Sequence, residues 1–288
     1  MHRSILLPLA LAATALATPA LAQSTDTPPA SGTTTEDFGD AITVGAAGVY
    51  LPDYEGSNDY RWTAAPAAIG SVKGFAFSVL GNRASIDLIP NKPGPSWDIQ
   101  AGPIGVVNFN RQSLKSIDDP RIRALGKVDT AIELGGYIGL GKTGVITSPY
   151  DKLSVSLSYR HDVSNSHDSA IWQPSINYLT PLSRKAAVGL FASAEHAGDG
   201  YATTYFSITP AQSLASGLPV YNAHGGWKNY SVGGVVTYSL TGDLLHGFKV
   251  LAGGTYRRML NDFGDSPTVS IAGDRSQWMG AVGLAYTF

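Results

Sequence analysis

The stretch that decides the fold is the last one, residues 276–288, which reads SQWMGAVGLAYTF. Counting back from the end, every second residue is apolar, aromatic or Gly, and the residues between are small or mildly polar. A period of two is the pattern of a β-strand with one apolar face. Trp278 and Phe288 place aromatic rings at the two ends of that face, about ten residues apart, as in membrane-spanning strands. A soluble edge strand would be expected to carry Lys, Pro or a bulge against aggregation, and this stretch carries none.

The end of this stretch resembles the closing strand of bacterial outer-membrane proteins, in which a terminal Phe follows aromatic or aliphatic residues at alternate positions. In those proteins the barrel-assembly machinery reads the end of the chain. The resemblance implies that Tyr286 and Phe288 form the assembly signal, and that the partners include this machinery and outer-membrane lipid. The alternative is an edge strand of a soluble β-sandwich.

Eleven further segments are patterned as strands between polar or Gly/Pro-rich connections. They are residues 42–51, 62–71, 75–79, 82–89, 97–108, 128–140, 152–162, 169–180, 185–196, 230–240 and 247–258. We predict an all-β fold, a transmembrane antiparallel up-and-down β-barrel of about 12 strands, an even number that leaves both chain ends periplasmic. If residues 62–89 form two strands rather than three, the barrel has 10. Pro103 indicates a bulge or a locally unpaired position in its strand.

The chain divides into three parts. Residues 1–22 combine a basic start, an apolar run too short for a membrane helix, and a small-residue site for cleavage between Ala22 and Gln23, as in a secretory signal peptide. Residues 23–40, rich in Ser, Thr, Pro and acid, are expected to form a disordered periplasmic tail. Residues 41–288 then form one barrel in the cell outer membrane, with the long connections 110–127, 198–227 and 259–275 outside the cell.

Composition narrows the function classes. The chain of 288 residues has no Cys, which excludes disulfides and Cys-based metal sites. Its 43% hydrophobic content is near the soluble average, but a barrel exposes only half of each strand to lipid. A formal net charge of −2 gives no signal for nucleic acid. The His residues show no paired spacing along a strand, so neither a metal nor another cofactor is predicted.

Charged residues of both signs recur on the polar faces of the predicted strands. Because the opposite faces are apolar, these residues are expected to point into the barrel. Opposite charges can pair across a barrel of this size and close it, or they can line a pore for solutes. The lumen-facing candidates are Asp87, Asp98, Asp129, Glu133, Arg160, Glu195, Lys249 and Arg257.

Two motifs could suggest chemistry. Residues 136–143 (GYIGLGKT) match the phosphate-binding loop pattern, but turn and strand residues follow where a helix is needed, so we interpret the match as chance. Outer-membrane lipases place a His and a Ser two apart on one strand, so that the His activates the hydroxyl. His161 and Ser164 are three apart, which sends them to opposite faces unless a bulge intervenes. We therefore predict no catalytic residues, with lipid hydrolysis by His161 and Ser164 as an alternative.

Several segments together resemble the MipA/OmpV family of outer-membrane proteins, named for interaction with the lytic transglycosylase MltA. They are PDYEGS at 52–57, YF at 205–206, SGLPVY at 216–221, GG at 225–226 and GLAYTF at 283–288. The resemblance implies a non-enzymatic scaffold that brings a lytic transglycosylase and a murein (peptidoglycan) synthase together. It offers no catalytic motif to carry over. The polar inner faces leave a second function open, that of a small channel for solutes or antibiotics.

Overall fold

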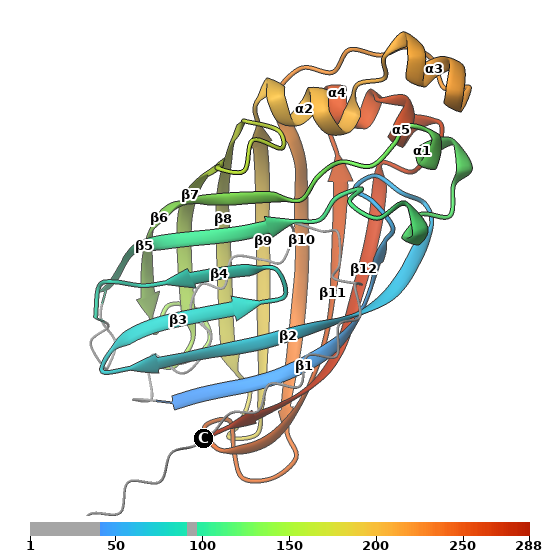
Figure 1. Ribbon diagram of the computed structural model, residues 1–288. Coiled ribbons are helices and arrows are strands. Elements are labelled where there is room, and N and C mark those ends of the chain that lie inside the picture. Colours follow the sequence, from blue (N-terminus) through green and yellow to red (C-terminus); the bar gives the residue numbers. More distant parts are fainter. Residues whose placement is uncertain (1–40, 91–96) are drawn as a thin grey trace, which may run out of the picture.

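The computed structural model describes residues 41–90 and 97–288, which form one sheet and the connections at its two ends (Figure 1). The predicted signal peptide and tail, residues 1–40, lie outside the described residues. The strands are β1 (Ala41–Pro52), β2 (Tyr60–Val72), β3 (Phe75–Leu80), β4 (Arg83–Ile86), β5 (Trp97–Asn108), β6 (Ala131–Thr143), β7 (Lys152–Asp162), β8 (Ala170–Pro181), β9 (Ala186–Ala197), β10 (Gly226–Ser239), β11 (Gly247–Met259) and β12 (Ser276–Thr287).

The sheet closes on itself. Each strand pairs antiparallel with its neighbour in the chain, and β12 pairs with β1, from Thr43 opposite Thr287 to Tyr50 opposite Gly280. This confirms the predicted transmembrane up-and-down β-barrel of twelve strands. The ten-stranded alternative is wrong, because β2 and β3 are separated by a two-residue turn. Lys73 and Gly74 in that turn have φ of 54° and 81°, the left-handed pair typical of a tight β-hairpin.

Pro103 lies inside β5 at a position where one neighbouring strand has ended. On one side it pairs with Gly136 of β6. On the other side β4 pairs with β5 only from Ile104 to Val106, and β4 ends at Ile86. The Asp87 carboxylate accepts the Ala101 N–H at 3.1 Å, in place of a strand carbonyl. A residue without an N–H fits here because no ladder bond is lost, as the sequence predicted.

The outward face of the barrel is apolar between two bands of aromatic rings. Near one end, Tyr256 lies against Trp278, with ring centroids 4.9 Å apart. Near the other end, Tyr286 contacts Phe248 and Phe288 at 4.8 and 4.9 Å. Exposed aliphatic side chains cover the strands between these bands. Aromatic rings at both interfaces and aliphatic residues between them are what a bilayer selects on the outside of a barrel.

Three long connections, β5–β6, β9–β10 and β11–β12, lie together at one end of the barrel (Figure 1). We call this the helical end, and the opposite end, with its short turns, the turn end. The helices are η1 (Leu114–Ser116), α1 (Pro120–Ala124), α2 (Asp199–Phe206), α3 (Pro210–Ser216), α4 (Asn261–Asp265) and α5 (Pro267–Ser270). Among the described residues, no helix has the length and apolarity needed to cross a bilayer.

These short helices replace what the sequence predicted as loops, and local capping explains where they begin. Asp119 precedes Pro120 and accepts the Arg121 N–H, which starts α1. Thr209 and Gln212 form a capping box at the start of α3. Proline at the first position and a capping side chain before it satisfy the free N–H groups of a helix start. Helices this short show no periodic apolar pattern that a sequence reading could detect.

The three long connections fold into a packed structure, which we call the cap (residues 109–130, 198–225 and 260–275). Tyr201 and Phe206 of α2 pack with Phe263 of α4 in one apolar cluster, and all three side chains are buried. Ile122 of α1 and Leu218 belong to a second cluster. The largest buried apolar groups of the protein therefore lie at the helical end, where they cover the mouth of the barrel.

Candidate functional site

Charged side chains fill the barrel interior directly below the cap. Glu133 of β6, Arg160 of β7 and Glu195 of β9 point inward and are fully buried. Arg160 Nε donates to Glu133 Oε2, and Arg160 Nη2 donates to Glu195 Oε1, both at 2.5 Å. Three of the residues that the sequence suggested for the lumen are therefore brought together in one ion-paired group.

A second cation extends this group toward the opposite wall. Lys228 Nζ of β10 lies 2.7 Å from Glu195 Oε2 and 2.7 Å from Glu55 Oε1 in the β1–β2 connection. Tyr201 donates its hydroxyl to Glu55 Oε2 at 2.7 Å, and its ring lies 4.5 Å from the Lys228 ammonium. Burial raises the pKa of Tyr201, and the Glu55 carboxylate raises it further, so the hydroxyl remains a donor. We call this set the buried ion chain: Glu133, Arg160, Glu195, Lys228 and Glu55.

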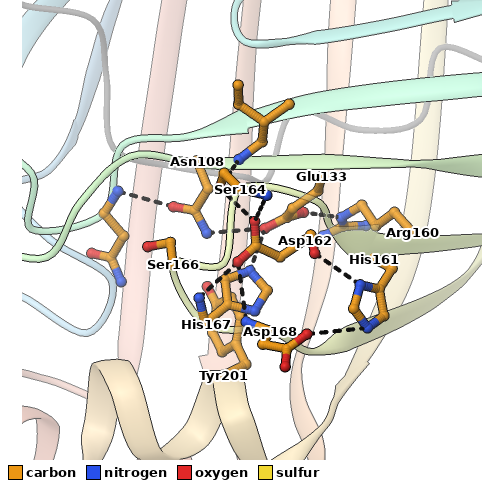
Figure 2. Close-up of polar contacts among 12 residues, drawn as sticks. Asn108, Glu133, Arg160, His161, Asp162, Ser164, Ser166, His167, Asp168 and Tyr201 are labelled. Carbon is orange, nitrogen blue, oxygen red and sulfur yellow. Dashed lines mark hydrogen bonds and ion pairs between the residues drawn. The ribbon is translucent and has the colours of Figure 1, made fainter.

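Glu133 has two further partners at its end of the ion chain (Figure 2). Asn108 Nδ2 donates to Glu133 Oε1 at 3.2 Å, and His167 Nε2 lies 3.3 Å from the same oxygen. Because a carboxylate only accepts, this contact places a proton on His167 Nε2. Each carboxylate of the ion chain thus meets donors from at least two elements, which offsets the cost of burying its charge.

This arrangement is suited to closing the barrel. The charged groups are held by opposite charges at hydrogen-bond distance, so they are not poised to exchange a proton with a bound molecule. Through Glu55 and Tyr201 the same contacts tie the wall strands to the β1–β2 connection and to α2. Side chains from the wall and the cap therefore fill the mouth of the barrel at the helical end.

The other residues suggested for the lumen lie apart from the ion chain. Asp98 pairs with Lys152 at 2.9 Å in the half of the barrel near the turn end. Lys249 donates to Thr287 Oγ1 at 2.5 Å and to the Leu244 carbonyl, which fastens the β10–β11 turn to the closing strand.

Three further candidates have individual environments. Asp87 follows β4 and holds backbone N–H groups, those of Ile89 and Ala101. Arg257 is buried in β11, and its Nη2 lies 3.5 Å from the Met279 sulfur. Asp129 is not a lumen residue: β6 begins only at Ala131, so the inward alternation does not reach Asp129, and its carboxylate is exposed.

His161 and Ser164 do not form a catalytic pair (Figure 2). The Ser164 hydroxyl donates to Asp162 Oδ1 at 2.6 Å and accepts the Ile132 N–H at 2.9 Å. His161 Nδ1 lies 2.9 Å from the Asp162 carbonyl. Ser164 lies beyond β7, which ends at Asp162, and both side chains are bonded to Asp162 rather than to each other, so the imidazole is not placed to activate this hydroxyl.

Two other kinds of site are unsupported by the geometry. The phosphate-loop match at residues 136–143 lies within β6 and is extended strand, so its N–H groups cannot surround a phosphate. Within residues 41–90 and 97–288, no group of three or more His, Asp and Glu side chains is placed to hold a metal ion.

Below the ion chain the interior changes character. A cavity of about 370 Å³ there is lined mainly by small and apolar residues, among them Val49, Ala65, Phe191, Val235 and Leu251. The sequence analysis placed charged residues on the inner faces of several strands, whereas the inward positions of β1, β2 and β12 that line this cavity are mostly small or apolar, such as Gly45, Ala67 and Gly283. Small residues on both faces of a strand conceal which face is inside.

Sequence reasoning missed two members of the ion chain, Lys228 and Glu55. The register of β9 and β10 shifts between Trp227 and Asn229, and this irregularity turns Lys228 inward against the alternation of its strand. Glu55 lies in a connection, where no periodic signal exists. In the sequence, Glu55 could have been singled out only through the segment PDYEGS, one of the segments that resemble the family.

The chain was compared with protein families, with curated sequences and with solved structures. A family model described as MltA-interacting protein MipA matches residues 44–288. Among solved structures, an outer membrane channel from Pseudomonas putida F1 matches with 11% identity and a TM-score of 0.40, covering 92% of this chain and 100% of that one. The outer membrane channel DcaP of Acinetobacter baumannii matches with 9% identity and a TM-score of 0.36, covering 87% and 96%. No curated protein sequence matches the chain.

The structural likenesses are too distant to bear on function, and the family match carries the assignment. It runs from Val44 in β1 to the last residue, and so includes most of β1, strands β2 to β12, the cap and each member of the ion chain. It confirms the resemblance seen in the sequence. The chain is an outer-membrane β-barrel, and it belongs to the MltA-interacting protein MipA family.

Proposed function

We propose that this barrel is a non-enzymatic scaffold that holds murein enzymes at the inner surface of the outer membrane. The observation that carries the proposal is the closed helical end, where the cap and the buried ion chain fill the mouth of the barrel. A barrel closed in this way offers its rims, rather than a continuous pore, as the working surface. The family description supports a lytic transglycosylase as partner, and a murein synthase is the second partner that the resemblance implied.

In this proposal the helical end faces outward from the cell and the turn end faces the periplasm, where murein enzymes work. Exposed apolar residues gather on two neighbouring turns of that end: Ile146 and Tyr150 between β6 and β7, and Leu182 between β8 and β9. The β6–β7 turn is joined to the end of β8, next to the second turn, by a hydrogen bond between the Thr147 and Thr180 hydroxyls at 2.8 Å. Apolar side chains on a rigid rim are suited to holding a protein partner.

Binding of a purified lytic transglycosylase and a murein synthase to the immobilised full-length barrel tests the proposal. We expect Ile146→Asp combined with Leu182→Asp to weaken binding at least tenfold. Leu214→Asp, on exposed α3 at the helical end, is the matched control and should bind as the native barrel does. Failure of the native barrel to bind either enzyme would overturn the scaffold proposal.

A small solute channel is the second candidate, and the cavity below the ion chain favours it. Single-channel recording on the refolded barrel separates the two, after a heat-dependent gel shift has shown that the barrel is folded. A scaffold with a closed mouth should show no conductance steps. Stable steps from the native barrel would favour the channel.

A further inference from the structure

The barrel wall is incomplete beside the hairpin of β3 and β4, which ends well short of the helical end (Figure 1). β2 pairs with β3 only along Ala67–Val72, although β2 itself begins at Tyr60. β4 pairs with β5 only through Arg83–Ser85. Beyond the hairpin tip, within the described ranges, residues 60–66 of β2 have no strand beside them on this side.

A cavity of about 420 Å³ occupies this place and is lined from both sides of the wall. Val49, Leu51 and Val106 belong to the inward face of the barrel. Val79 and Leu134 belong to the outward face and are exposed where bilayer hydrocarbon lies. This cavity has lining residues from both faces at the place where β2 has no neighbouring strand, so it lies in a gap of the wall. It therefore opens sideways, toward lipid.

The same opening continues into the interior. Val49, Ala65, Pro66 and Gly81 line both this cavity and the inner one of about 370 Å³. The two spaces therefore adjoin, and the path between them is walled almost entirely by carbon. Pockets for small molecules measure roughly 300–1,000 Å³, so each space has the size of a ligand site.

The backbone at the opening limits the cost of an unpaired edge. An exposed N–H in hydrocarbon is strongly unfavourable, so barrels normally pair every strand edge. The Pro66 carbonyl accepts the Gly81 N–H at 2.9 Å, the last contact between β2 and the hairpin. Pro66 has no N–H of its own, so the first position of the free edge presents no donor to lipid.

We propose that this lateral opening admits a linear acyl chain from the bilayer into the barrel interior. An acyl chain matches the observations because its entrance faces hydrocarbon, its path is apolar, and the buried ion chain blocks the route of a polar solute at the helical end. Transfer of methylene groups between two apolar environments requires no loss of hydration. This inference is independent of the scaffold role, which concerns the rim of the turn end.

Photo-crosslinking with mass-spectrometric mapping tests the proposal. The full barrel is reconstituted in bilayers that carry a diazirine on an acyl chain, either within a phospholipid or as a free fatty acid. Val235 and Val236 are adjacent residues of one type, and Val235 lines the inner cavity while Val236 faces lipid. We expect adducts on both. If the phospholipid probe labels Val235, the acyl chain comes from membrane lipid. If only the free fatty-acid probe labels Val235, the ligand is a fatty acid.

The variant Ala65→Phe fills the junction of the two cavities, and we expect it to reduce Val235 adducts at least tenfold while Val236 adducts stay unchanged. Ala192→Phe, on the outward face of β9, is the matched control and should reduce neither. If Ala65→Phe fails the gel-shift test of folding, Ala65→Leu takes its place. Labelling confined to Val236 in the native barrel, or Val235 labelling that survives the blocked junction, would overturn the proposal.

Discussion

Arg160 shows how much one residue can determine in this barrel. Its guanidinium is fully buried and joins carboxylates from β6 and β9, two strands that are not neighbours in the sheet. A buried charge without a partner is strongly unfavourable, whereas a pair with satisfied hydrogen bonds is tolerated. Arg160 therefore holds a part of the interior that neither packing nor strand pairing would hold by itself.

Replacing Arg160 with Met should destabilise the folded barrel by about 3–5 kcal/mol, because Glu133 and Glu195 would remain buried without it. The measurement is urea-induced unfolding in vesicles, followed by the heat-dependent gel shift. Arg258→Met is the control: Arg258 is exposed on β11 and donates to Ser276 Oγ, so the loss should stay below about 0.5 kcal/mol. Equal losses in the two variants would contradict the role given to Arg160.

Asp151 predicts an acid sensitivity of the turn end. Burial tends to raise its pKa, but the N–H groups of Thr147, Val145 and Ile146 and the Tyr178 hydroxyl hold that pKa well below its ordinary value. A depressed carboxylate pKa contributes stability at a pH above the unfolded value of about 3.9, and the contribution is lost as the pH falls toward the folded pKa. The protection of the β6–β7 turn amides, measured as their exchange rate relative to that of unstructured amides at the same pH, should therefore fall below about pH 4. In the Asp151→Asn variant, the amides of this turn should already exchange rapidly at neutral pH, and their protection should depend less on pH.

At the scale of elements, Lys228 is one of the links between the cap and the strands. Its ammonium bridges Glu195 on the wall and Glu55 in the β1–β2 connection, and the ring of Tyr201 in α2 lies against it. The apolar clusters of the cap pack without Lys228, so the cap itself should survive its loss. Lys228 adds a charged link between cap and wall to the apolar contacts that Ile171, Ala197 and Met259 of the wall make in the same cluster as Tyr201.

Lys228→Met should therefore loosen the mouth of the barrel and produce brief conductance steps in bilayers where the native barrel is silent. The physical reason is that Glu55 loses its cation and attracts water into the interior. Lys127→Met is the matched control, because the Lys127–Asp129 pair is exposed on the surface of the cap. Silence of a folded Lys228→Met barrel would show that the apolar packing of the cap closes the mouth without the ion chain.

The elements also show what the sequence could and could not predict. The strands were predictable because a bilayer forces an apolar residue at every second position, as in Tyr230, Val232 and Val236 of β10. Glu133, Arg160 and Glu195 were predictable for the same reason, since they lie opposite apolar neighbours. Lys228 was not predictable, because a register shift reverses the inward–outward alternation at this position. The lateral opening was not predictable either, because it arises from the shortness of β3 and β4 and not from any one residue.

For the whole molecule, closure depends on β12. The Phe288 N–H donates to the Ile42 carbonyl at 2.9 Å, while the Phe288 ring is exposed on the lipid side. An exposed ring contributes little to the folded barrel beyond its contact with Tyr286. We therefore propose that Phe288 acts in assembly rather than in stability, as the resemblance of this strand to the closing strands of outer-membrane proteins implied.

Deleting Phe288 should lower the fraction of heat-modifiable barrel in the outer membrane several-fold, whereas the unfolding midpoint of barrel that does assemble should change little. Pulse-chase labelling with gel-shift detection measures the first quantity, and urea titration of purified barrel measures the second. Trp278→Ala, which removes an exposed ring at the other end of β12, is the control for loss of an aromatic anchor. A shift in the unfolding midpoint with normal assembly would contradict the assignment.

The shortness of the β3–β4 hairpin has a mechanical consequence. When a bilayer is stretched, lateral tension acts around the circumference of the barrel, and the weakest seam yields first. The seam between the chain ends runs from Thr43 to Tyr50, whereas β4 is in strand register with β5 only along Arg83–Ser85, with isolated bonds from Asn82, Asp87 and Leu88 on either side. This wall should therefore part away from the chain ends, so that β1 and β12 stay joined and guide the sheet back into register when the tension is released. The short hairpin would thus let the wall open and close under tension while the pairing of β1 with β12 is kept.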